Sequence, residues 1–363
     1  MNLIELHILQ SFPVSCLNRD DVGSPKSALF GGVPRARISS QSLKRACRML
    51  AREEHPGFQG IRSRFLLEPF TRALVAASVP EDKAPVHATA ICNLFSKVDA
   101  KHAEQVTTAV YLSPGEIQRI AEFVAAGIDQ ANDAGAGEAD SKKADEKIAK
   151  AVAKLAKDAI KNANRLDAAD ISLFGRMVAN DATLNVDGAA MFSHALSTHR
   201  ADNEVDFFSA VDDGKGDAED AGASMIGTLE FNSATYYRYV AVNLDMFADP
   251  KHLGPLTEDE RTAILRAFIK AVLQSVPGAR QNSMNAGTLP HEVLGICKTK
   301  GQPLQLINAF ETPVAAKGQG YAATSLDKMK SHIESLEKTW GPQGDKHYLT
   351  EQGLESFLDS LLA

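Results

Sequence analysis

A long helical stretch interrupts this chain of 363 residues and most constrains the fold that it can adopt. Residues 66–165 are predicted to be helical, with a capping box at Ser113–Glu116 and an alanine- and lysine-rich amphipathic segment from residue 141 onward. The flanking chain favours strands instead. "NLIELHILQ" near the N-terminus interleaves polar with apolar residues, and "MIGTLEF" and "TYYRYVAVNLDMF" are rich in β-branched and aromatic residues. We therefore expect a helical insertion within a strand-containing core.

The order of the remaining elements indicates the kind of core. After the first strand come a long loop (residues 11–37), a helix from Ser39 or Ser40 to about Glu54, and the helical insertion. Then follow a strand predicted for "ISLFGRMV" from Ile171, a protruding ribbon, another strand, a helix and a last strand. Without its insertions this order resembles a split βαβ, ferredoxin-like core, which is also the topology of the RNA-recognition motif. The fold class that we predict is α+β.

The charge of the chain is unevenly distributed. The net charge is −7, yet residues 1–64 contain ten Lys or Arg against five acids, so this segment is +5 and the remainder −12. Local rather than net charge decides whether phosphate is attracted, because salt screens the field within about 8–10 Å. No apolar run approaches the roughly 20 residues of a membrane span, and the four cysteines are scattered. We expect a cytoplasmic protein with no membrane segment.

The stretch "RARISSQSLKRACR", Arg35–Arg48, concentrates five cations and no carboxylate in fourteen residues. On a helix its polar side chains recur at i, i+3, i+4 and i+7 and so share one face. Serines crowd the helix start, where free N–H groups and the helix dipole favour an anion. This pattern fits a row of phosphates, and a solvated basic helix is the alternative. The residues of the shared face are Gln41, Lys44, Arg45 and Arg48.

Other features leave two interpretations open. In "VDFFSAVDD" adjacent Phe207 and Phe208 point to opposite sides of a strand, so one ring is free to stack on a base unless both anchor the ribbon. The lysine face of residues 141–166 either meets nucleic acid or is solvated, and we favour the latter.

Asp20 and Asp21 either bind a metal or cap a turn. No nucleotide-binding, nucleophile-elbow or zinc-protease motif is present, and the spacing of His194 and His199 gives little support for a metal site.

Several of these segments together resemble one known family. "SCLNRDD", "FGG", "RARISSQSLKRA", "GRM", "VDGAAMFSHALSTH", "VDFFSAVDD", "GTLEFNSATYYRY", "VPGARQ" and "INAF" match, in order and spacing, the backbone subunit of the type I-E CRISPR Cascade surveillance complex. This is the CasC family of the RAMP superfamily. The resemblance spans essentially the whole chain and is loose only in the helical stretch and the C-terminal region.

The resemblance implies a hand-shaped α+β fold with a modified RNA-recognition-motif (ferredoxin-like) palm. The palm would comprise residues 1–65, 166–194 and 229–363, including the C-terminal helices. The helical insertion, residues 66–165, would be the fingers, and a β-hairpin insertion, residues 195–228, would be the thumb. These boundaries are expectations from the family.

The resemblance also implies which residues bind RNA. Met177 on one side and Phe207, Phe208 and Ser209 of the thumb on the other would wedge against a flipped-out nucleotide. A close relative has Trp-Phe where this chain has Phe207-Phe208, so Phe208 is the safer of the two rings. Lys317 is a weak candidate in the C-terminal half. The phosphate contacts would fall on Arg19, Lys26, Ser39, Gln41, Lys44, Arg45 and Arg48.

The implied function is non-catalytic and needs neither metal nor cofactor. Copies of the chain would form a helical filament along the CRISPR RNA and present it for pairing with the target DNA strand in antiviral defence. The expected partners are CRISPR RNA, target DNA, neighbouring copies and the other Cascade subunits: the large subunit, the small subunit, the 5′-handle-binding subunit and the 3′-hairpin-binding endoribonuclease. The alternative is a metal-dependent, RNA-cleaving backbone subunit of the type III kind, with Asp20 or Asp21 as the acid.

Overall fold

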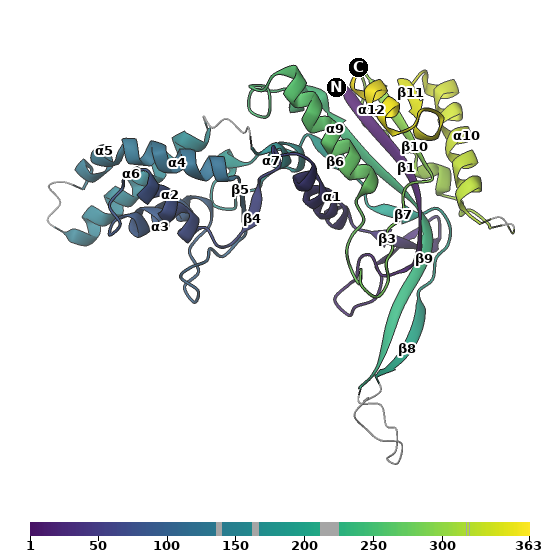
Figure 1. Ribbon diagram of the computed structural model, residues 1–363, viewed down its shortest axis with the longest axis horizontal. Coiled ribbons are helices and arrows are strands. Elements are labelled where there is room, and N and C mark those ends of the chain that lie inside the picture. Colours follow the sequence, from purple (N-terminus) through teal and green to yellow (C-terminus); the bar gives the residue numbers. More distant parts are fainter. Residues whose placement is uncertain (136–139, 162–166, 211–224, 317, 319) are drawn as a thin grey trace, which may run out of the picture. The chain divides into compact units, whose positions relative to one another are not determined.

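The computed structural model describes residues 1–135, 140–161, 167–210, 225–316, 318 and 320–363, which form two compact units (Figure 1). The first unit comprises Met1–Ala51, Met191–Leu244 and Leu265–Ala363. The second comprises Arg52–Ala190 and Asp245–Ile264. Each unit has its own core, and each is described separately below.

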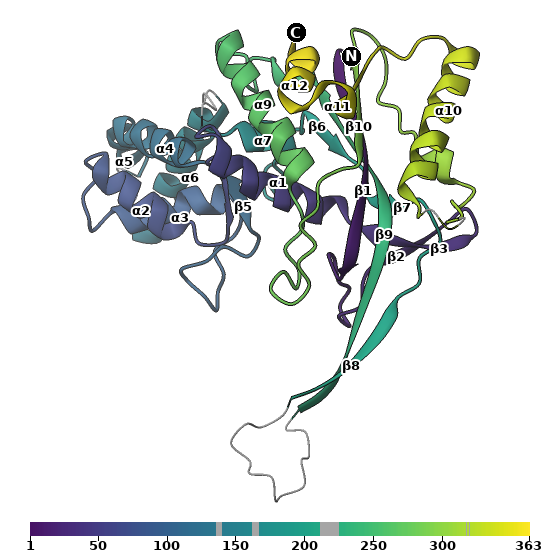
Figure 2. The ribbon, with the colours of Figure 1, turned by 45° about the vertical axis from the view of Figure 1, so that its right-hand side comes forward.

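The first unit is built on an antiparallel sheet in which the N-terminal strand is central. The strand β1 (Leu3–Ser15) pairs on one side with β10 (Glu292–Lys298) and on the other with β9 (Met225–Asn243), as Figure 2 shows. The sheet order is β11-β10-β1-β9-β7-β3-β2. The remaining strands are β2 (Ser27–Phe30), β3 (Val33–Ile38), β7 (Ala195–Ser197) and β11 (Asp345–Tyr348), and β6 (Ala190–Phe192) and β8 (Glu204–Ala210) both pair with β9.

Two sequence predictions for this sheet are corrected. Residues 11–37 were expected to form one long loop, but β1 continues to Ser15 and the segment also contains the hairpin β2–β3. The two strands predicted for "MIGTLEF" and "TYYRYVAVNLDMF" are one continuous strand, β9. The first correction depends on a pairing that is distant in sequence, because β3 pairs with β7, far along the chain.

Helices cover both faces of this sheet (Figure 2). On one face Leu43 of α1 packs with Phe12, and the guanidinium of Arg238 donates to the carbonyl of Val272 in α9 at 2.6 Å. On the other face Met329 of α10 packs against Tyr237. The helical elements are α1 (Ser40–Glu54), α8 (Leu244–Phe247), α9 (Glu258–Gln274), η2 (Ile307–Phe310), α10 (Ala322–Trp340), α11 (Leu349–Gln352) and α12 (Leu354–Leu362).

The face beneath α10 contains buried polar side chains that contact residues far away in the sequence. The Glu5 carboxylate pairs with Lys298 at 2.6 Å and accepts a hydrogen bond from the Tyr239 hydroxyl at 2.7 Å. Nδ1 of His7 lies 2.9 Å from the Tyr237 hydroxyl, and burial, aided by the Lys298 charge, lowers the pKa of His7 to about 3. These tyrosines are buried in the core, so they cannot stack on bases as the sheet aromatics of an open RNA-recognition motif do.

The hairpin β2–β3 turns on the two glycines of "FGG". Gly31 and Gly32 have φ values of +60° and +76°, the left-handed region that a tight two-residue hairpin turn requires. A side chain at Gly31 would also collide with the main chain, since a Cβ there would lie 1.7 Å from the carbonyl oxygen of Glu311. This close approach fixes the hairpin against the segment after η2.

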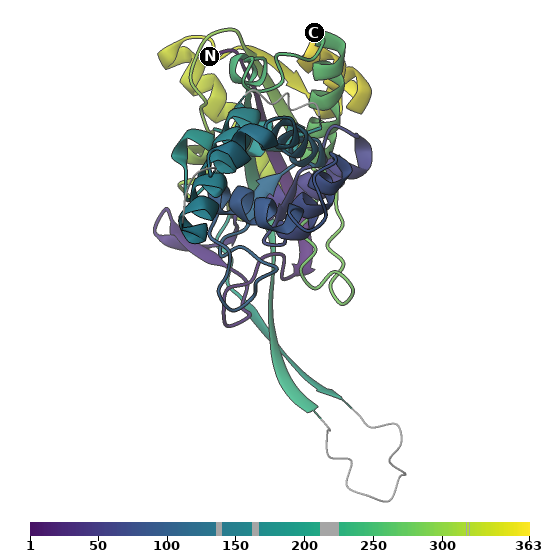
Figure 3. The same cartoon turned by 90° about the vertical axis from the view of Figure 1, so that its left-hand side faces the viewer.

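The second unit is mainly helical (Figures 1 and 3). Its core packs residues of four helices, among them Phe70, Ile91, Ile120 and Val152. The predicted capping box is confirmed, because the Ser113 hydroxyl accepts from the Glu116 N–H at 3.1 Å and the Glu116 carboxylate accepts from the Ser113 N–H at 3.2 Å. The elements are α2 (Leu67–Ala76), α3 (Ala84–Phe95), α4 (Pro114–Ala126), α5 (Ile128–Asp133), α6 (Ser141–Lys161), α7 (Ala169–Phe174), η1 (Ala182–Leu184), β4 (Ile61–Ser63) and β5 (Val110–Leu112).

The strand predicted for "ISLFGRMV" is wrong, because the segment begins with the short helix α7. Residues 168–173 are buried on every side, and a short apolar run of this kind has the same pattern in a helix and in a buried strand. Asp170 favours the helix, since its Oδ1 accepts hydrogen bonds from its neighbour Ile171 and from Gly60. Gly175 then ends the helix with φ +82°.

Candidate nucleic-acid interface

The loop that carries Arg19 and Lys26 is held against the start of α1. The Lys26 N–H donates to the Asn18 carbonyl at 2.9 Å, and the Arg37 N–H donates to the Lys26 carbonyl at 2.8 Å. The side-chain oxygen of Asn18 accepts from the Ser39 N–H, also at 2.9 Å. These bonds hold the loop with its two cations beside β3 and the first turn of α1. The predicted phosphate contacts of the loop and of the helix therefore belong to the same region of the first unit.

The first turn of α1 contains no acid and is capped from two directions. Ser39 is buried, and its hydroxyl accepts from the Ser42 N–H at 3.3 Å. The next free amide, that of Ser40, donates to Nδ1 of His194 at 2.9 Å. Burial and the nearby charges of Arg37 and Lys26 lower the pKa of His194. Because Nδ1 accepts this hydrogen bond, the neutral imidazole carries its hydrogen on Nε2.

The helix α1 separates an apolar face from a cationic one. Leu43, Cys47 and Ala51 are buried, as predicted. Arg45 is exposed, as is Gln41, whereas Lys44 and Arg48 are half-buried. Lys44 lies with Nζ 5.6 Å from the centre of the Phe192 ring, and burial lowers the pKa of this ammonium. The helix thus presents both free and partly desolvated positive charge on one side.

The positive charge at this surface is not neutralised by carboxylates. Within the described residues, no acid lies within 4.0 Å of the charged nitrogens of Arg19, Lys26, Arg37, Lys44 or Arg45. We call these five residues the basic cluster. Asp20 and Asp21 lie in the same loop as Arg19 but form no ion pair with these five cations among the described residues, and positive charge of this kind favours an external polyanion.

Arg35 lies in the same sequence stretch but has a different role. Its side chain is 0% exposed and donates four hydrogen bonds to carbonyls of Phe30, Ser197, Phe310 and Glu311, at 2.8–3.2 Å. Three separate segments of the first unit are tied together by this one guanidinium. Arg35 is therefore a structural residue and not part of the basic cluster.

The two phenylalanines of β8, Phe207 and Phe208, differ in exposure. Phe207 is 64% exposed and lies opposite Thr228 in the pairing of β8 with β9. Phe208 is half-buried opposite Gly227, and a Cβ at that glycine would lie 2.6 Å from Cζ of the Phe208 ring. The Phe208 ring therefore lies across Gly227, and Phe207 is the ring that faces outward. Ser209 is exposed on the same strand.

Met177, in the second unit, is held in an exposed position by its neighbours. Arg176 is buried and pairs with Glu116 at 2.9 Å, and the N–H of Val178 donates to the side chain of Asn185 at 2.7 Å. Met177 itself is 77% exposed. A large apolar side chain fixed on both sides and pointing outward suits a wedge. Lys317 lies outside the described residues, so its predicted contact has no structural counterpart.

Asp20 caps a turn. Its Oδ1 accepts hydrogen bonds from the N–H groups of Val22 and Ser24, at 3.1 and 2.9 Å. Within the described ranges, no group of three or more His, Cys, Asp and Glu side chains is arranged to hold a metal ion. In the same part of the chain, no helix is long and apolar enough to cross a membrane.

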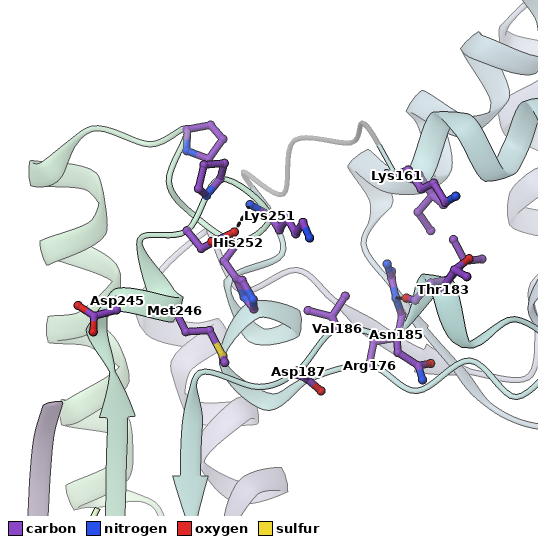
Figure 4. Close-up of a pocket in the computed structure, with 15 residues that line it drawn as sticks. Lys161, Arg176, Thr183, Asn185, Val186, Asp187, Asp245, Met246, Lys251 and His252 are labelled. Atoms are coloured by element: carbon purple, nitrogen blue, oxygen red, sulfur yellow. Dashed lines mark hydrogen bonds between the residues drawn. The ribbon is translucent and has the colours of Figure 1, made fainter. Parts of the chain in front are cut away.

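The largest pocket that we describe lies in the second unit and differs from the basic cluster (Figure 4). Its volume is about 960 Å³, and Figure 4 shows lysines and acids around it, including Lys161, Lys251, Asp187 and Asp245. Because the pocket mixes both signs and the charge of Arg176 is already paired with Glu116, it lacks the one-sign field of a polyanion site.

The sequence patterns did not single out two residues of the first unit, His194 and Arg280, and neither was predicted as a contact. His194 follows no spacing rule and acts through a hydrogen bond to a residue 154 positions away. The motifs "VDGAAMFSHALSTH" and "VPGARQ" that contain them were the available signal.

The fold and the basic cluster define an α+β protein with a group of cations at its surface, and comparison with known proteins identifies its family. The model of the CT1975-like protein family matches residues 4–360, so the chain belongs to this family. None of the curated proteins compared matches it in sequence.

Two solved structures show the same fold. A chain of a "CRISPR RNA-guided surveillance complex, pre-nicking" is 28% identical, with a TM-score of 0.74 over 95% of this chain and 91% of that one. A chain of a "CRISPR RNA-guided surveillance complex" is 22% identical, with a TM-score of 0.66 over 99% of both chains, and this second match concerns the fold alone. The expected kinship with surveillance-complex subunits is confirmed at this level.

Proposed function

We propose that the chain is the CRISPR RNA-binding backbone subunit of a type I-E Cascade surveillance complex. Several copies bind side by side along one guide RNA as a helical filament, and the guide then pairs with the target DNA strand. The large, small, 5′-handle-binding and 3′-hairpin-binding subunits complete the assembly. The similarity to a chain of an RNA-guided surveillance complex over 95% of the length supports this proposal.

The observation that carries the proposal is the uncompensated basic cluster. Five cations without a described carboxylate partner lie in one loop, in β3 and in α1, which the hydrogen bonds of Asn18 and Lys26 hold together. Groups of cations favour phosphate oxygens and do not read a base. Binding through this surface is therefore independent of RNA sequence, which a guide-carrying protein requires.

The topology of the first unit supports a ferredoxin-like palm. In the order β10-β1-β9-β7, the first core strand β1 lies between the third, β9, and the last, β10. Along the chain, α1 follows β1, and α9 lies between β9 and β10. The sheet aromatics are buried under α10, so RNA does not bind in the manner of an open RNA-recognition motif. Binding along the loop and the α1 start fits a backbone-binding variant of the fold.

Exposed apolar side chains supply the second part of the proposed interaction. Phe207 on the ribbon and Met177 in the second unit are both more than 60% exposed. In the filament the ribbon of one copy closes over RNA bound by its neighbour, and these side chains wedge beside a flipped-out nucleotide. Stacking of one base on an aromatic ring contributes about 1–3 kcal/mol whatever the base.

The proposed subunit is non-catalytic, and the alternative is a metal-dependent RNA-cleaving subunit. Asp20 already accepts two backbone hydrogen bonds, which is the ordinary role of a turn aspartate. The alternative is tested by incubating the assembled complex with complementary RNA and Mg²⁺. Cleavage at regular intervals that disappears in Asp21→Ala would establish it and would contradict the non-catalytic proposal.

The central experiment is to co-express the full chain with a CRISPR RNA and the remaining subunits and to image the purified complex. We expect several copies along one RNA, with nuclease footprinting that repeats at a fixed interval. The same footprint should appear with a guide of unrelated sequence and equal length. A purified complex that contains a single copy, or RNA that is cut uniformly along its length, would contradict the proposal.

A further inference from the structure

Arg280 has an unusual backbone conformation for its residue type. Its φ is +54°, and only one other non-glycine residue of the described chain, Ser78, has a positive φ. Left-handed backbone strains an L-residue with a long side chain, and such strain persists where the surrounding structure enforces it and often where function needs it. The carbonyl of Arg280 accepts from the N–H groups of Ser283 and Met284, at 3.1 and 2.8 Å, which holds the turn in place.

The guanidinium of Arg280 is not neutralised within the described structure. Its Nε is buried and has no hydrogen-bond partner there, and no described carboxylate lies within 4.0 Å of its charged nitrogens. It does hydrogen-bond to the Cys16 thiol, a weak acceptor that carries no charge in this setting because burial raises its pKa. Partly buried charges in proteins are normally paired, so a strained and unpaired arginine points to an absent anion.

The position of Arg280 links it to the basic cluster. Cys16 begins the loop that carries Arg19 and Lys26, and the charges of both Arg19 and Arg280 act on its sulfur. The loop after α9 is anchored there, because Ala286 packs in the same apolar group as Leu17 and Leu43 of α1. Arg280 therefore lies beside the predicted phosphate-binding loop, although more than 250 positions separate them in the sequence.

We propose that Arg280 is a further RNA-phosphate ligand, which binds the same backbone as Arg19 and the basic cluster. The inference rests on the proposed RNA-binding function and adds a contact from the loop after α9. The RNA phosphate supplies the anionic partner that the folded chain lacks for this guanidinium. In this left-handed turn the side chain of Arg280 reaches the Cys16 thiol at the start of that loop.

The test uses Arg280→Gly, which removes the charge and relieves the backbone strain at the same position. We measure binding of the full chain to a labelled single-stranded guide RNA across a range of salt concentrations, together with thermal unfolding. The expected result is an unfolding midpoint that is unchanged or higher, an affinity lower by roughly five- to tenfold, and a log–log salt slope smaller by about 0.7, the value for one phosphate contact. Arg280→Lys should keep the wild-type slope.

Two further variants keep the test decisive. Arg280→Asn removes the charge with a residue that tolerates left-handed backbone, and it replaces Arg280→Gly if the glycine loosens the loop. Ser78→Gly relieves the other positive φ and should leave RNA binding unchanged. Wild-type affinity and slope in both Arg280→Gly and Arg280→Asn would overturn this inference alone. Absence of RNA binding by the wild-type chain would instead overturn the proposed function.

Discussion

Two parts of the molecule look equally basic in sequence and differ in their partners. The basic cluster lies around the start of α1, and the lysine-rich helix α6 spans Ser141–Lys161. In the basic cluster no described carboxylate balances the cations. In α6 acids are interspersed among the lysines, and Lys157 pairs with Asp181 at 2.5 Å. The comparison shows that the presence or absence of nearby acids separates a candidate phosphate surface from a solvated helix face.

The packing of the two helices explains this difference. The helix α6 buries a stripe that includes Val152, Ala156 and Ile160 and leaves other lysines, such as Lys150 and Lys154, exposed to solvent. In α1 the cation Lys44 lies partly buried against the Phe192 ring, and the helix start is held by contacts from the loop and from His194. Fixed, partly desolvated charge binds a phosphate more strongly than mobile surface charge does.

The largest expected effect is on the free energy of unfolding. It distinguishes Arg35 from Arg37 within the stretch Arg35–Arg48. Arg35→Met removes four hydrogen bonds to carbonyls and should lower the free energy of unfolding by about 3 kcal/mol or more, since bonds to a charged donor contribute about 1.5–3 kcal/mol each and do not add fully. Urea denaturation of the full chain measures the change. Arg37→Met, two residues away and half-buried, is the matched control.

Arg37→Met should change the free energy of unfolding by less than about 0.5 kcal/mol while it weakens RNA binding. Equal destabilisation by the two variants would mean that Arg35 is not the tie between the hairpin and the segment after η2. Loss of RNA binding in a folded Arg35→Met variant would place Arg35 in the interface after all.

The next prediction compares cations of α1 directly with lysines of α6. Lys44→Ala combined with Arg48→Ala should weaken RNA binding by roughly 10- to 100-fold for every sequence and reduce the log–log salt slope by about 1.4. Lys150→Ala combined with Lys154→Ala in α6 is the matched control and should change affinity less than twofold. Salt-dependent binding to guide RNA and to scrambled RNA of equal length measures both. A larger effect from the α6 pair would reverse the comparison.

The sequence predicted the parts of this surface that depend on local spacing. The helix from Ser40 to Glu54, its buried positions and its cationic face all follow from residues that are neighbours in the chain. The burial of Arg35 does not, because its acceptors come from residues 197, 310 and 311 as well as from the hairpin. The hairpin in residues 27–38 is local, and the two glycines of "FGG" were an available signal for its turn, whereas the further pairing of β3 with β7 is not visible in the local sequence.

The pairing of β8 with β9 shows a similar limit to prediction from sequence. Alternation along a strand predicted that one of two adjacent phenylalanines is exposed, and the structure identifies it as Phe207. The choice depends on Gly227 in the opposite strand, which leaves room for the Phe208 ring. No local pattern contains this information, because the register of β8 with β9 decides which side chain meets the glycine.

The last comparison concerns a single exposed ring and separates Phe207 from Phe208. Phe207→Ala removes an exposed side chain and should reduce RNA affinity by about 1–3 kcal/mol per stacked base in the assembled complex, with salt slope and ribbon pairing unchanged. Phe208→Ala uncovers Gly227 and should also increase amide exchange along β8, because the cross-strand contact is lost. A fluorescent base analogue at the repeating interval reports stacking in both variants. If Phe208→Ala alone releases the base while exchange along β8 stays at the wild-type level, Phe208 is the wedge and Phe207 is not.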